Sequence, residues 1–112
     1  MSVSYSISLP DPAQARGPEP ALSFTAHGAE AFAEQLQVAL TDPAWIGRWL
    51  ALQDEPEDVD PDLSLVDPEA RVSGEQHDLR IDLQATTRLP GEIVRHRLRL
   101  LAGSHWELRN VR

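Results

Sequence analysis

Polar and apolar residues alternate near the start of the chain, and this pattern predicts two β-strands. In segment 2–9 (SVSYSISL), apolar side chains occupy every second position between serines, and segment 21–28 (ALSFTAHG) repeats the alternation. A two-residue period is typical of a strand with one buried face. Four prolines and a glycine separate the two segments in 10–20. We therefore expect the strands to pair as an antiparallel hairpin with a long connection.

Segment 28–53 has the longer apolar period of α-helices. In 28–40, alanine, phenylalanine and leucine recur at helical spacing, with glutamate and glutamine opposite them. Asp42 and Pro43 then suit the N-cap and the first residue of a second helix, which ends at about residue 53. An apolar stripe on this second helix fits either the core or a docked partner helix, and we favour the core. The members of the stripe are Trp45, Trp49 and Leu52.

The segment 54–70 (DEPEDVDPDLSLVDPEA) differs from the rest of the chain in composition. It contains eight carboxylates, three prolines and no cation. Proline and like-charge repulsion both oppose regular structure, so we expect an extended, mobile loop. Its first part lacks the residue spacing and the glycine of a calcium-binding loop, and we expect no calcium site there.

Alternation returns in the last third of the chain, in segments 77–89, 92–101 and 105–112. Pro90 and Gly91 suit the two central positions of a type II turn between the first two of these segments. The pattern predicts a three-stranded antiparallel meander.

Residues 92–102 also fit a helix, with Pro90 near its start and Gly103 as its terminating glycine. On such a helix Arg97 falls among apolar side chains, whereas a strand leaves no arginine among them. We therefore favour the strand, and the helix stays open as the alternative. The predicted fold class is α+β, in a single domain of 112 residues. Its parts are an N-terminal β-hairpin, two helices packed on one face, and a C-terminal antiparallel three-stranded meander.

If 92–101 is a strand, five arginines share one uncovered face of the sheet: Arg80, Arg95, Arg97, Arg99 and Arg109. We call this predicted surface the arginine face. Two interpretations stay open. In the structural one, alternate residues simply point to solvent and their long stems cover apolar sheet surface. In the functional one, the face binds an anion or an acidic partner.

Charge is distributed unevenly along the chain. The net charge of −8 divides into −3 in residues 1–53 (five acids, two arginines), −8 in 54–70 and +3 in 71–112 (five acids, eight arginines). We therefore expect the acidic loop to lie near the arginine face at low salt, with a freely solvated loop as the alternative.

Sequence motifs for chemistry are missing. The chain has no cysteine, which excludes disulfides and thiolate sites. It also lacks a P-loop, a G-x-G-x-x-G fingerprint, a G-x-S-x-G elbow and the histidine spacing of zinc sites. We expect no catalytic residues, cofactor or metal, although an enzyme with a pocket near His77 and His96 stays open.

These observations favour a non-enzymatic protein–protein interaction module with an unknown protein partner, or with a second copy of itself as a homodimer. The alternative is a nucleic-acid or other anion-binding protein that uses the arginine face, but the charge of −8 opposes binding to nucleic acid. We expect a cytoplasmic protein, since no signal peptide or membrane-spanning run is visible. All ten basic residues are arginine, a usage typical of GC-rich bacterial genomes.

Overall fold

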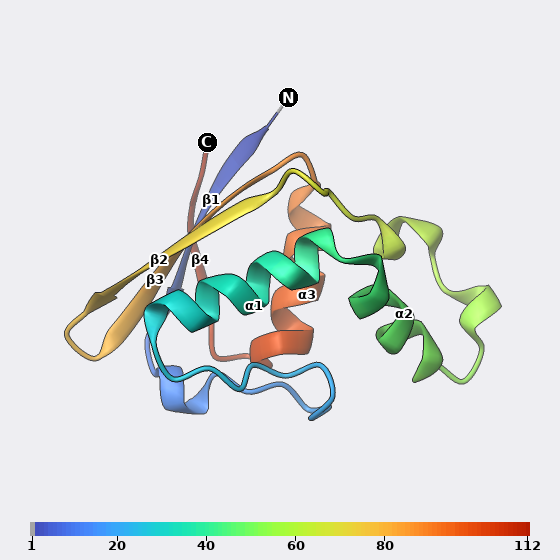
Figure 1. The fold of residues 1–112 in the computed structure, drawn as a ribbon, viewed down its shortest axis with the longest axis horizontal. Coiled ribbons are helices and arrows are strands. Elements are labelled where there is room, and N and C mark those ends of the chain that lie inside the picture. Colours follow the sequence, from blue (N-terminus) through green and yellow to red (C-terminus); the bar gives the residue numbers. More distant parts are fainter. Residues whose placement is uncertain (1) are drawn as a thin grey trace.

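A four-stranded antiparallel sheet, covered on one face by helices, organises the computed structural model, which describes residues 2–112 (Figure 1). The strands follow the spatial order β2-β3-β1-β4. They are β1 (Val3–Leu9), β2 (Arg71–His77), β3 (Arg80–Thr87) and β4 (Glu107–Val111). The helices are α1 (Ala29–Thr41), α2 (Pro43–Ala51) and α3 (Gly91–Ala102). The α+β class predicted from the sequence is thus confirmed.

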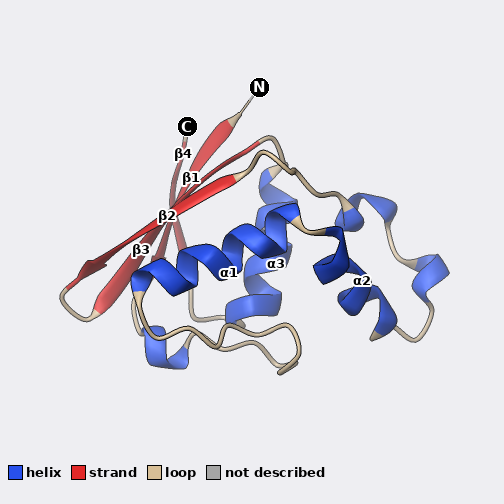
Figure 2. Ribbon diagram, viewed as in Figure 1, coloured by secondary structure: helices blue, strands red, loops and turns tan. Residues whose placement is uncertain are grey.

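Two of the three helices pack against the sheet, and the third lies beyond them. Figure 2 shows α1 and α3 next to the strands, with α2 on the far side of α1. The alternation predicted for β1 and β3 places their buried residues under these helices, as in the pairing of Ile7 with Leu83. The two helices predicted in 28–53 are present, with Asp42 as N-cap of α2: its carboxylate accepts a hydrogen bond from the Ala44 N–H at 2.8 Å. No helix in residues 2–112 is long and apolar enough to cross a membrane.

The predicted N-terminal hairpin is wrong. Residues 21–28 form an irregular segment, and β1 instead pairs with β3 and β4, between which it lies. The alternation in this segment has another cause. Leu22, Phe24 and Ala26 are buried against the helices while the residues between them are not, and the Phe24 ring meets Phe32 edge-on at 4.9 Å.

The predicted meander is also wrong, because residues 91–102 form the helix α3, which ends at Gly103 with a φ of 64°. The strand that pairs with β3 comes instead from the residues before it. This strand, β2, was not predicted, since it has little apolar content. It joins β3 through a two-residue turn in which Asp78 has a φ of 55°.

The contacts of the Arg97 side chain explain how the helix α3 can carry an arginine among its buried apolar residues. The side chain is fully buried, and its guanidinium donates hydrogen bonds to the carbonyls of Ala39 (2.8 Å), Leu63 (2.8 Å) and Leu65. Ala39 lies in the last turn of α1, where carbonyl groups lack helical partners and carry partial negative charge. Burial lowers the pKa of Arg97 to about 10, so the group stays charged at neutral pH.

A second buried contact fixes the end of segment 54–70, which we call the acidic segment. The Asp67 carboxylate accepts hydrogen bonds from the Thr87 hydroxyl (2.8 Å) and from the N–H groups of Arg88 (2.9 Å) and Glu69 (3.1 Å). The Asp67 N–H in turn donates to the carbonyl of Leu40 at 2.8 Å. Asp67 therefore ties the acidic segment both to the end of β3 and to α1. The hydrogen bond from the Arg88 N–H is the largest cause that lowers the pKa of Asp67, and burial opposes it.

Replacing Arg97 by methionine is expected to lower the free energy of unfolding by about 2–4 kcal/mol, because one buried and two partly buried carbonyls lose their donor. Urea denaturation measures this loss. Hydrogen exchange should quicken at the amides of residues 62–66 more than in the sheet. Arg95→Met, at an exposed position of the same helix, is the control and should change stability by less than about 0.5 kcal/mol. Equal losses in the two variants would contradict the role assigned to Arg97.

Replacing Asp67 by asparagine is expected to destabilise the protein by about 1–3 kcal/mol at pH 7, since charge-assisted hydrogen bonds are lost. The folded-state pKa of Asp67 is lowered, so its stabilisation is complete above the unfolded value of about 4 and is lost as the pH falls through the folded value. Denaturation curves between pH 7 and pH 2 should therefore converge for the two proteins in acid. A constant difference over this range would show that Asp67 is not the titrating group.

Candidate binding groove

The arginines predicted to share one face are spread over the molecule. Arg97 is buried under the acidic segment, whereas Arg95 and Arg99 lie on the exposed side of α3. Arg80 and Arg109 are in the sheet, in β3 and β4. The predicted arginine face is thus wrong, because it required residues 92–101 to be extended.

The two sheet arginines are next to acids of their own strands. Arg80 lies 3.3 Å from Asp82, and Arg109 lies 3.2 Å from Glu107. All four side chains are partly exposed, and such surface pairs contribute little to stability. They do, however, reduce the positive potential that an anion would meet at either position.

The uncovered face of the sheet carries hydroxyl and amide groups beside charged side chains such as Asp82. Ser4 and Thr86 hydroxyls are 3.2 Å apart, and the Ser6 hydroxyl donates to the Gln84 side chain at 2.8 Å. The Ser8 side chain is buried, and its hydroxyl has no partner within residues 2–112. Most of the polar groups on this face therefore satisfy one another across neighbouring strands.

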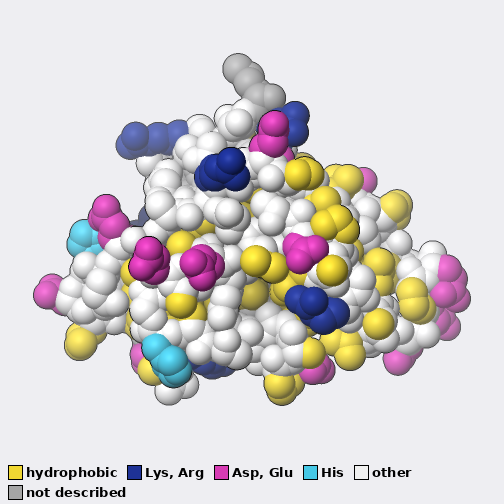
Figure 3. Space-filling model, in the orientation of Figure 1, with side chains coloured by type: hydrophobic (Ala, Val, Ile, Leu, Met, Phe, Trp, Pro, Cys, Tyr) yellow, Lys and Arg dark blue, Asp and Glu magenta, His cyan; other side chains and the backbone are white. Residues whose placement is uncertain are grey.

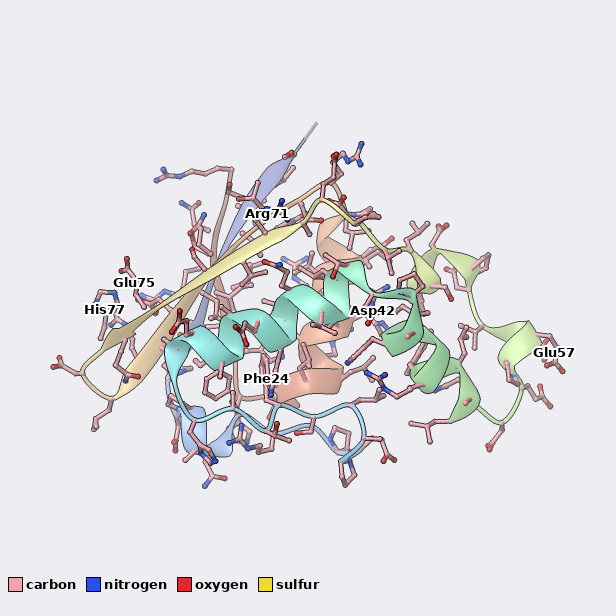
Figure 4. All side chains as sticks on the ribbon, in the orientation of Figure 1. Phe24, Asp42, Glu57, Arg71, Glu75 and His77 are labelled. Atoms are coloured by element: carbon pink, nitrogen blue, oxygen red, sulfur yellow. The ribbon has the colours of Figure 1, made fainter. Side chains whose placement is uncertain are left out.

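Before Asp67, the acidic segment is held by its backbone and not by its carboxylates. It contains two short 3-10 helices, Pro56–Asp58 and Pro61–Ser64, where a wholly extended loop was predicted. Arg97 binds the carbonyls of Leu63 and Leu65. Within the described part of the chain, the carboxylates of residues 54–62 are exposed and form no ion pair (Figure 4, which labels Glu57). The predicted attraction between these acids and an arginine face is therefore not what docks the segment.

The histidines do not meet in one place. His77 lies on β2, 3.2 Å from Glu75 and 3.6 Å from Asp82 (Figure 4). His96 lies on α3, where its ring meets Trp49 edge-on at 4.9 Å. Burial lowers the pKa of His96, and the charges of Arg97 and Arg99 act in the same direction. No three potential metal ligands of the His, Cys, Asp or Glu type come together in residues 2–112.

A groove of about 330 Å³ lies between residues 20–25, α1 and α2, and we call it the α1–α2 groove. Apolar side chains from four parts of the chain (residues 20–25, α1, α2 and the end of α3) line it, and one acid and one base lie among them. The apolar residues include Leu22, Val38, Trp45 and Leu101, and the charged residues are Glu34 and Arg48. Figure 3 shows the apolar side chains that gather over α1 and α2 on this face, with acidic and basic groups beside them.

The loop wall of the groove is fixed by hydrogen bonds to the helices. The side-chain amide of Gln35 accepts from the Thr25 N–H at 2.9 Å and donates to the Thr25 hydroxyl at 2.8 Å. The Phe24 N–H donates to the carbonyl of Leu101 at 2.9 Å. The groove is therefore formed before any partner arrives, which lowers the entropic cost of binding.

The two charges of the groove have no partner of their own. Glu34 and Arg48 are exposed, and neither takes part in an ion pair within residues 2–112. Val38, near the C-terminal end of α1, is 41% exposed. The groove can thus accept an apolar group and two opposite charges at the same time.

Sequence reasoning missed this groove because it placed residues 21–28 in a strand. Without the loop wall, Val38 and Arg48 looked like ordinary surface residues of two helices. The stripe of α2 divides as follows: Trp45 and Trp49 are buried in the core as expected, with Trp45 also lining the groove, and Leu52 is 48% exposed.

The arrangement has no counterpart that the comparisons with known proteins could find. No family model matches the chain. No curated protein and no solved structure matches it either. What the α1–α2 groove does must therefore be argued from its own chemistry.

Proposed function

We propose that this protein is a non-enzymatic protein–protein interaction module that holds a short segment of a partner protein in the α1–α2 groove. The observation that carries the proposal is a preformed apolar groove with an unpaired acid and an unpaired base among its lining residues. Protein interfaces share this anatomy, in which an apolar centre lies within a polar rim.

The dimensions and charges of the groove specify the segment. A volume of about 330 Å³ is at the small end of binding pockets and suits one or two side chains. Full burial of one leucine-sized side chain is worth about 1.5–3 kcal/mol. Glu34 and Arg48 add orientation, because they attract opposite charges on either side of the apolar anchor. The segment that fits is an apolar residue with an acid on one side and a base on the other.

The alternative of an anion-binding protein has lost its supporting geometry, since it needed five arginines on one face. The third possibility, an enzyme with a pocket near His77 and His96, required two histidines that in fact lie on β2 and α3 and line no common cavity within residues 2–112. The α1–α2 groove gives the binding role a defined surface, whereas the cavity at His96 is lined by residues that do not include His77.

Selection from a random peptide library displayed on phage tests the proposal. Peptides enriched on the immobilised protein should share an apolar residue between an acidic and a basic one. They should bind Val38→Asp at least about ten-fold more weakly, because a carboxylate then replaces apolar lining. Leu52→Asp is the matched control, since Leu52 is as exposed as Val38 but lies outside the groove.

Two results would contradict the proposal. The library could yield no enriched sequence, or the enriched peptides could bind the Val38→Asp and Leu52→Asp variants equally well. Circular dichroism of both variants should first show that each one is folded.

A further inference from the structure

The turn between β2 and β3 carries the most exposed large apolar side chain of the described residues. Leu79 is 86% exposed, whereas the next most exposed is 49%. It is one of the two residues of a tight turn, next to Asp78, whose positive φ closes that turn. Figure 1 shows this hairpin projecting beyond the helices at one end of the molecule. Leu79 is thus held out from the body by a paired hairpin.

The residues next to Leu79 in the sequence carry opposite charges. Asp78 precedes it and Arg80 follows it. This acid–apolar–base order is the pattern that the α1–α2 groove fits, with Arg48 available for Asp78 and Glu34 for Arg80. Arg80 already pairs with Asp82 at 3.3 Å, but both side chains are partly exposed. Such a surface pair is weak and can give way to a new partner.

We propose that the occupant of the α1–α2 groove is the β2–β3 hairpin of a second copy of this chain, with Leu79 as the apolar anchor. The inference rests on the proposed function, because it uses the same groove. It goes further by naming the partner and the residue that enters. The hairpin needs no folding on binding, since the register of β2 with β3 already fixes its tip.

The hairpin and the groove are different surfaces of one chain, and each copy offers one of each. Two copies can therefore close into a dimer with two equivalent contacts, or further copies can be added head to tail. A single hairpin tip buries far less than the roughly 1,200 Å² of a stable interface. The association is therefore weak and depends on concentration.

Sedimentation equilibrium of the full chain, at concentrations up to about 1 mM, tests the inference. The average mass of the wild type should rise with concentration. Leu79→Ser removes the anchor and Val38→Asp spoils the groove, so each variant alone should stay monomeric. An equimolar mixture of the two should form pairs and stop there, because one intact hairpin meets one intact groove. Leu52→Ser is the control and should associate as the wild type does.

Other outcomes overturn the inference. They are a wild type that is monomeric at every concentration, a Leu79→Ser variant that still associates, and a mixture that remains monomeric. If Val38→Asp does not fold, Arg48→Glu replaces it as the groove variant, because Arg48 is exposed.

Library peptides separate this inference from the proposed function. If the wild type stays monomeric while such peptides still bind in a Val38-dependent manner, the groove binds another protein, and only the assignment of its occupant to a second copy of the chain is wrong. If the peptides also fail to bind, both proposals fall.

Discussion

The buried guanidinium of Arg97 connects three parts of the chain: α3, the end of α1 and the acidic segment. It binds the carbonyl of Ala39 from the end of α1 and those of Leu63 and Leu65 from the acidic segment. A lysine has a single nitrogen and lacks this planar, forked set of donors. An apolar residue would leave the carbonyls without a partner in the core. Arg97 is thus used for its hydrogen-bond donors, and within residues 2–112 it forms no ion pair with a carboxylate.

This arrangement accounts for the shape of the acidic segment. Like charges repel one another along residues 54–62, and this repulsion opposes a compact arrangement of the segment by itself. Arg97 binds the segment's backbone at Leu63 and Leu65, and the end of β3 binds the side-chain carboxylate of Asp67. The carboxylates before these points remain in solvent, where their repulsion costs little.

How far the fold could be predicted from the sequence depended on whether burial had a local pattern. The periods of β1, β3, α1 and α2 are visible because each element buries one face against the core. The same rule failed at residues 21–28, which alternate but lack a neighbouring strand, and at α3, where an arginine in the core argued for a strand. The carbonyls that satisfy Arg97 come from 58 and 34 residues away in the sequence, and no local pattern reports them. The groove was hidden for the same reason, since its walls come from four separate segments.

The place of β1 inside the sheet has a consequence for how the molecule forms. β1 leaves the ribosome well before both of its neighbours in the sheet, β3 and β4: Val3 lies opposite Thr87, and Tyr5 lies opposite Val111. Contacts this distant in sequence slow folding, because a long loop must close before they form. During synthesis, both edges of β1 therefore stay unpaired until β3 and β4 have been made. Its alternating serines give the unpaired strand one hydrophilic face, which limits its tendency to pair with strands of other nascent chains.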